Sequence, residues 1–314
     1  MEAPGVSDVS AAGLERPLEF DRAGQIKVGL LTLAFVGVFA HVFYNLQHYW
    51  LNDADYSHGP LIPFFSIYLV HQHWEQARRA PVRHTWLGMA LMLAALATYQ
   101  YTLWGLEIGY LRPLSMLLCL LGIIIYLCGL PVLRYVWVAW AFLFFAVPLP
   151  KSIYFAITDP MRRIAATVAT WTLSLFPDLS IERVGSTIEY FYHGKVGHLG
   201  VADACSGMRS TMTLCALGVA IAFVSERPWW QRLILIGSCV PIAIFSNFIR
   251  VITTCVLYIF VDAKYAGGNY HTLLGLGTMG IALAIFLGVA WVLSNLFVEA
   301  NEPAAAAGEI GRTS

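Results

Sequence analysis

Long apolar segments separated by short polar ones dominate the chain. A helix that crosses a bilayer needs about 20 mostly apolar residues, and eight segments reach or approach that length. We predict membrane helices at 28–47, 60–74, 86–104, 113–130, 135–150, 205–224, 231–261 and 271–298. The second and fifth are short and carry prolines at one end, which is typical of tilted, broken or re-entrant helices.

The segment 151–204 interrupts this pattern. Residues 158–177 place Pro160 at an early helical position and combine an apolar face with a twin-arginine patch, as in a helix lying along the membrane interface. Residues 180–201 alternate and are rich in Ile, Val and Tyr, with His-Gly-Lys as a turn, which predicts a β-hairpin. The predicted fold is an all-α polytopic membrane protein of about eight transmembrane helices, with a small extracytoplasmic insertion of an interfacial helix and a β-hairpin.

Composition agrees with a membrane location. The chain has 314 residues, of which 58% are hydrophobic and 12% charged, whereas soluble domains carry about 25% charged residues. A formal net charge of zero argues against a nucleic-acid partner. The six cysteines form no CxxC pair and no His/Cys cluster with metal-ligand spacing, so we expect no metal and no cofactor. No cleavable signal peptide is evident, and the first apolar segment is expected to remain as an anchor.

Charge in the short loops predicts the orientation. Arginines cluster in the loop 75–84, near residue 134, and at 227 and 232, and basic residues also mark the N-terminal tail. By the positive-inside rule these parts are cytoplasmic, as are the tails 1–26 and 299–314, which flank a single membrane domain at 27–298. The insertion 151–204 is placed outside although it contains five basic residues, because the rule is weak for long segments.

One cysteine lies in a polar setting. Cys205 stands in HLGVADACSGMRS, at the mouth of an apolar segment, and the other five lie inside apolar runs, where packing explains them. Small neighbours leave room for a substrate backbone, and a helix that begins there would direct free N–H groups at the sulfur. This setting favours the nucleophilic thiolate.

Two further polar residues fall at the same predicted membrane depth. Arg250 is nineteen residues beyond Gln231, near the start of its helix, which places it about 28 Å along, at the outer edge. His271 opens the last helix on the outer side. Taken singly, each has a simpler explanation as an interfacial side chain. Together with Cys205 they resemble a thiol, an acid/base and an oxyanion partner.

These blocks resemble a known family. VADACSGMRS, then SNFIRV, then NYHTLLG, together with DADYSHGPLIPF and VPLP earlier in the chain, are similar to motifs of the exosortase/archaeosortase family of membrane-embedded cysteine transpeptidases. The resemblance covers about 48–285 and maps the family's catalytic Cys, Arg and His onto Cys205, Arg250 and His271. His271 suggests the bacterial branch, and hence the inner membrane, whereas Asp203 departs mildly from the usual Glu.

The resemblance implies a substrate and a mechanism. The substrate would be a secreted protein whose C-terminal tail has a Pro-Glu-Pro-like motif, a transmembrane helix and a basic end. Cys205 would form a thioester, His271 would protonate the departing amine, and Arg250 would stabilise the thiolate or the oxyanion. Whether the thiolate pairs with His271 or with Arg250 stays open, as does the acceptor.

Other polar residues are candidates for supporting roles. Backbone N–H groups near Ser206 and Gly207 are further oxyanion donors. Three residues fit a role as supporting partners of the catalytic groups: Asp203, Arg209 and Asn247. Arg209 could instead bind a substrate carboxylate. Tyr56, Ser57 and His58 either cap a loop or position substrate.

Three other functions compete with this hypothesis. A transporter would carry polar residues near mid-bilayer and internal repeats, and neither is evident. A non-catalytic component of a surface-polysaccharide or export system leaves the coincidence of Cys, Arg and His unexplained. A membrane protease that hydrolyses its thioester would have the same sequence features as a transpeptidase.

Overall fold

The computed structural model describes residues 22–296 except 84, 106–107, 201–206, 226, 263 and 265–267. Both predicted tails therefore lie largely outside the described residues. In chain order the elements are α1 (Arg22–Val38), α2 (Ala40–Asn52), η1 (Ala54–Tyr56), α3 (Leu61–Gln72), α4 (Trp74–Arg79), α5 (Trp86–Trp104), α6 (Leu111–Leu127), α7 (Leu130–Phe142), η2 (Leu143–Ala146), α8 (Lys151–Leu173), β1 (Leu179–Val184), β2 (Thr187–Tyr192), β3 (Lys195–Gly200), α10 (Gly207–Val224), α11 (Trp229–Val256), the π-helical η3 (Leu257–Val261) and α12 (Gly268–Leu296).

Each of the eight predicted apolar segments is helical over most of its described residues, but the structure does not support eight spans. Within the described residues, two helices are long and apolar enough to cross a membrane, Trp229–Val261 and Thr272–Asn295. The number rises to four if two bent helix pairs each count as one span. Length is one reason: α3 has 12 residues and α6 has 17, so they reach about 18 and 26 Å, against a hydrocarbon core of about 30 Å.

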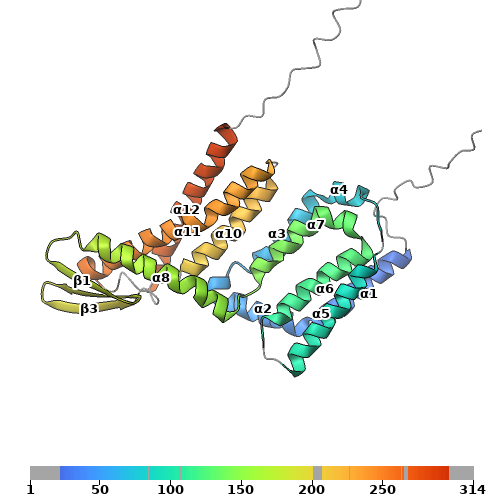
Figure 1. The fold of residues 1–314 in the computed structure, drawn as a ribbon, viewed down its shortest axis with the longest axis horizontal. Coiled ribbons are helices and arrows are strands. Elements are labelled where there is room, and N and C mark those ends of the chain that lie inside the picture. Colours follow the sequence, from blue (N-terminus) through green and yellow to red (C-terminus); the bar gives the residue numbers. More distant parts are fainter. Residues whose placement is uncertain are drawn as a thin grey trace, which may run out of the picture.

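The helices form two groups that meet near η1 (Figure 1). In one group α5 and α6 pack closely at Gly88. The absence of a side chain there permits the approach, since a Cβ atom on Gly88 would lie only 2.3 Å from the backbone nitrogen of Tyr126. In the other group α10, α11 and α12 lie side by side. Their shared core contains Leu214, Leu235 and Phe286, each at most 1% exposed.

Helix α8 crosses the end of the second group and leads to the sheet (Figure 1). It makes an angle of 79° with the preceding helix, Leu130–Ala146. It begins directly after the extended Pro150, so Pro160 lies inside the helix rather than at an early position, which corrects the prediction. Three small buried residues, Ala165, Ala166 and Ala169, let α8 pack closely against α11.

The insertion carries three antiparallel strands in the order β1-β2-β3, one more than predicted. The predicted turn is confirmed: Tyr192 pairs with Lys195, and both residues between them, His193 and Gly194, have positive φ. The additional strand β1 joins β2 through a second two-residue turn at Gly185. Leu179 and Ile188 attach the sheet to the α8–α11 core.

Candidate active site

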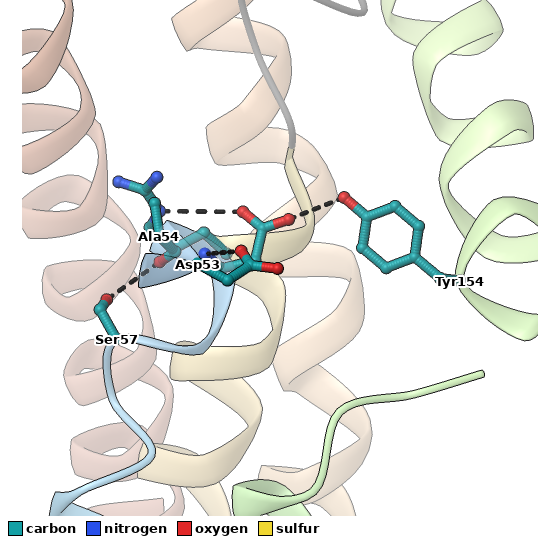
Figure 2. Close-up of polar contacts among 6 residues, drawn as sticks. Asp53, Ala54, Ser57 and Tyr154 are labelled. Atoms are coloured by element: carbon teal, nitrogen blue, oxygen red, sulfur yellow. Dashed lines mark hydrogen bonds and ion pairs between the residues drawn. The ribbon is translucent and has the colours of Figure 1, made fainter. Parts of the chain in front are cut away.

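Asp55 links three separate elements of the fold. Its carboxylate accepts a hydrogen bond of 2.7 Å from the Tyr154 hydroxyl of α8 and lies 3.8 Å from Nε of Arg209 on α10. Figure 2 shows Tyr154 reaching from α8 towards the loop that holds Asp53 and Ala54. Because the Asp55 side chain is only 14% exposed, these contacts fix the loop against the beginnings of α8 and α10.

The loop is also held from within. The Asp53 carboxylate accepts a hydrogen bond of 2.9 Å from the Asp55 backbone N–H, which caps η1. Ser57, a predicted site residue, is exposed, and its hydroxyl donates to the Ala54 carbonyl at 3.0 Å (Figure 2). Ser57 thus has the capping contact that the sequence offered as one of its two alternatives.

Tyr56 and His58 are buried, at 4% and 8% exposure. The Tyr56 hydroxyl accepts a hydrogen bond of 3.0 Å from the backbone N–H of Leu149, which joins the DADYSHG and VPLP motifs. The two rings stack at a centroid distance of 6.4 Å. Both side chains therefore help to build the loop, and contact with substrate stays a prediction for them.

Burial lowers the pKa of the His58 imidazole, although the nearby backbone of Phe145 and Asp55 and the Asp55 charge partly oppose the shift. Neither ring nitrogen has a hydrogen bond of good geometry from the described residues. The pKa of an unfolded histidine is about 6.5. Below that pH the unfolded chain therefore binds a proton at His58, whereas in the folded chain His58 stays neutral down to a lower pH.

We therefore expect stability to fall as the pH drops below about 6.5, until the lower folded-state pKa is reached. Melting temperatures in detergent between pH 8 and pH 5 measure this dependence. His58→Gln should flatten part of the acid slope, even if it lowers the melting temperature at every pH. An unchanged slope in that variant would assign the effect to other groups.

Arg250 is the arginine that the sequence placed at the same membrane depth as Cys205 and His271. On α11 it is only 8% exposed, and it lies against α12, since a Cβ atom on Gly275 would be 3.5 Å from its Nη2. Position 271 precedes Gly275 by four residues and therefore lies on the same face of α12, about 6 Å along the axis. The backbone thus places position 271 one helical turn from the residue that contacts Arg250.

Asn247 and Ser246 lie beside Arg250 on α11 and are equally buried, at 4% and 2% exposure. The Ser246 hydroxyl donates to the Thr278 carbonyl at 2.7 Å, which ties α11 to α12. Oδ1 of Asn247 accepts no hydrogen bond within the described part of the chain. Its amide oxygen is thus available to a hydrogen-bond donor that enters the site.

Other predicted site residues lie outside the described residues: Asp203, Cys205 and Ser206. Gly207 is the first described residue of α10, two positions after Cys205 in the sequence. The roles of Cys205, Arg250 and His271 in catalysis stay predictions.

Sequence reasoning missed Asp55 and Tyr154. Asp55 belongs to the DADYSHGPLIPF motif, but its partners are 99 and 154 residues away in sequence, and no local pattern connects them. A signal was present in the motif itself, which carries two aspartates where a simple cap needs one. The Asp55 contact favours a structural role for Arg209 over the alternative of a substrate ligand.

We expect Asp55→Asn to lower the melting temperature by about 2 to 6 °C, because a hydrogen bond to a charged group contributes roughly 1.5 to 3 kcal/mol. The half-exposed Arg209 should add little. Tyr154→Phe should reproduce most of the loss. Asp53→Asn is the matched control, since Asn caps as well as Asp. Equal melting temperatures for Asp55→Asn and Asp53→Asn would remove Asp55 from this role.

Comparison with known proteins places the chain in a family. A sequence model of transmembrane exosortases (Exosortase_EpsH) matches residues 50–288, which include the η1 loop, α8, Arg250 and position 271. No curated protein and no solved structure matches the chain. The match covers most of the chain, and with its apolar helices the protein is a helical membrane protein that belongs to the transmembrane exosortase family.

Proposed function

We propose that the protein is a membrane-embedded cysteine transpeptidase or protease that cleaves the C-terminal sorting tails of secreted proteins. Membership of the exosortase family supports this function. The observation that carries it is the buried Arg250, which lies against α12 one turn from position 271. Burying an arginine in a membrane costs free energy unless the guanidinium pairs with a negative charge. A thiolate or an oxyanion supplies such a charge.

In the proposed reaction the Cys205 thiolate attacks the carbonyl carbon of the scissile peptide. The new C–S bond forms as the C–N bond breaks, and His271 gives its proton to the departing amine. A nucleophile on a cell-surface acceptor, or water, then attacks the thioester and gives its proton to His271, and the sulfur leaves as a thiolate. Arg250 cannot release its proton at working pH, so it holds charge throughout.

Asp55 acts as a positioning residue in this proposal. Through Arg209 it reaches the first turn of α10, four residues after Cys205. Through Tyr154 it reaches the first turn of α8. These contacts would hold the chain around Cys205 at a constant distance from α11 and α12.

The proposal places the protein in a bacterial inner membrane, with both termini in the cytoplasm and the site on the outer face. Secreted substrates with a Pro-Glu-Pro-like motif, a transmembrane helix and a basic tail would then meet Cys205 after translocation. The short basic loop around Arg78 and Arg79 would be cytoplasmic.

This orientation predicts a labelling pattern. An impermeant maleimide applied from outside should modify cysteines placed at the exposed Asn52 and Lys195, and should miss one at the exposed Gln76. Permeabilised cells, in which all three must react, provide the control. Labelling of Gln76→Cys alone in intact cells would invert the orientation and place the site where translocated substrates do not reach it.

Mass spectrometry of a tailed secreted protein co-expressed with this chain tests the proposed function. We expect loss of the tail at one bond close to its motif, and addition of an acceptor mass if the reaction is a transfer. A tail that stays intact when a cognate substrate is present would contradict both the transpeptidase and the protease form of the proposal.

A further inference from the structure

A polar pocket that is lined by none of the candidate-site residues lies between α8 and the turn that joins β1 to β2. Its volume is about 340 Å³. The residues that line it are Asp159, Arg162, Arg163, Arg183, Gly185 and Ser186. Three arginines and one aspartate give this lining a formal charge of +2. Such a pocket favours an anion.

The arginines leave hydrogen-bonding capacity unused. Arg162 is 17% exposed at its side chain and lies 3.4 Å from Asp159, while its Nε is buried and has no partner among the described residues. Nη1 of Arg183 donates to the Gly185 carbonyl at 2.7 Å, which holds the guanidinium at the pocket edge. Arg163 is exposed next to them. Planar guanidinium groups arranged in this way suit the oxygens of a phosphate.

The surroundings of the pocket favour a lipid as the source of a phosphate. Helix α8 exposes large apolar side chains whose contact with water is unfavourable: Ile153, Phe155, Ile157, Ile164 and Trp171, each at least 42% exposed. Helix α8 also lies at 79° to the preceding helix. A helix with an exposed apolar surface and basic residues binds the boundary between lipid headgroups and acyl chains.

We propose that this pocket binds the phosphate of an anionic lipid headgroup and thereby anchors α8 and the sheet at the membrane surface. The lipid would stabilise the helix that also carries Tyr154, eight residues before Arg162. Lipid binding is measured directly and does not depend on the proposed peptidase activity, so the two proposals can fail separately.

The test uses the purified full-length protein in neutral detergent, with native mass spectrometry of bound phosphatidylglycerol. Arg163→Gln and Arg183→Gln each remove one pocket cation. Lys195→Gln removes an exposed cation from the same sheet outside the pocket and is the matched control. Because Arg163 is exposed, its replacement spares the fold even if Arg183→Gln disturbs the β1–β2 turn.

We expect each pocket variant to bind phosphatidylglycerol about tenfold more weakly than the wild type, and the Lys195 variant to bind it equally well. Phosphatidylcholine, which has no net charge, should be retained poorly by all of them. Equal binding by the wild type and both pocket variants would overturn the proposal. So would binding of inorganic phosphate, or of an acidic peptide such as hexaglutamate, that is at least as tight as binding of the lipid, because the pocket would then serve a soluble anion.

Discussion

Cys205→Ala and Cys205→Ser should abolish processing of tailed substrates, a loss of at least about a thousandfold. Removal of the sulfur removes the covalent route, and a serine hydroxyl at this position lacks the low pKa that makes a thiol a nucleophile near neutral pH. Processing is followed by the mobility and mass of a co-expressed substrate. Both variants should accumulate in the membrane at wild-type levels.

Cys128→Ala is the matched control for this loss. Cys128 is half-buried at the C-terminal end of α6, and Cys119 is buried in the same helix. Alanine at Cys119, Cys128 or Cys239 should leave processing near the wild-type rate. Normal processing by either Cys205 variant would remove this residue from the mechanism.

His271→Gln should slow cleavage by about 10² to 10⁴, the range typical of lost general acid–base catalysis. Glutamine retains a hydrogen-bonding side chain but cannot transfer the proton. The wild-type rate should depend on pH through a limb that this variant lacks. Cleavage by His271→Gln at close to the wild-type rate would exclude the general-acid role.

Arg250→Lys separates charge from geometry. A lysine keeps a cation near the sulfur but loses the planar fork, so we expect partial activity, about 10- to 100-fold below the wild type. Arg250→Gln, which loses the charge, should be lower still. Because Arg250 is buried against Gly275, the amount of folded protein must be measured for each variant. Equal rates for the Lys and Gln variants would mean that the charge is not used.

The sequence predicted the helical segments better than it predicted the spans. Apolar runs located eight helical segments, but hydropathy does not show where a helix stops, and α3 and α6 end after 12 and 17 residues. The helix break at Phe39, where α1 and α2 meet at 61°, also has no proline to mark it. Tertiary packing decides these lengths and angles.

The insertion shows a similar division. The His193–Gly194 turn was predictable from its glycine, because two-residue hairpin turns need positive φ, which glycine adopts readily. Both residues have positive φ in the structure. Strand β1 was missed although Gly185 and Ser186 are a two-residue hairpin signal, because only the His-Gly-Lys turn was considered. The early-helix interpretation of Pro160 was wrong since the residues after Pro150 already form helix, and tertiary contacts with α11 outweigh the cost of an internal proline.

Sequence motifs named candidate site residues, but they did not show which distant elements meet around them. Arg250 and position 271 were expected at one level, and α11 and α12 do place Arg250 against Gly275, one turn beyond position 271. The Asp55 contacts to Tyr154 and Arg209 depend on how α8 and α10 pack around η1. Nothing local in the sequence specifies that packing.

Capture of the thioester tests the central claim most directly. Hydroxylamine attacks a thioester and leaves a hydroxamate on the acyl group, so a substrate cleaved in its presence should carry a C-terminal hydroxamate at the cut site. Mass spectrometry distinguishes this end from a free carboxylate. The account predicts the hydroxamate with the wild-type chain and no cleavage with Cys205→Ala. A free carboxylate alone in the presence of hydroxylamine, or cleavage by Cys205→Ala, would contradict it.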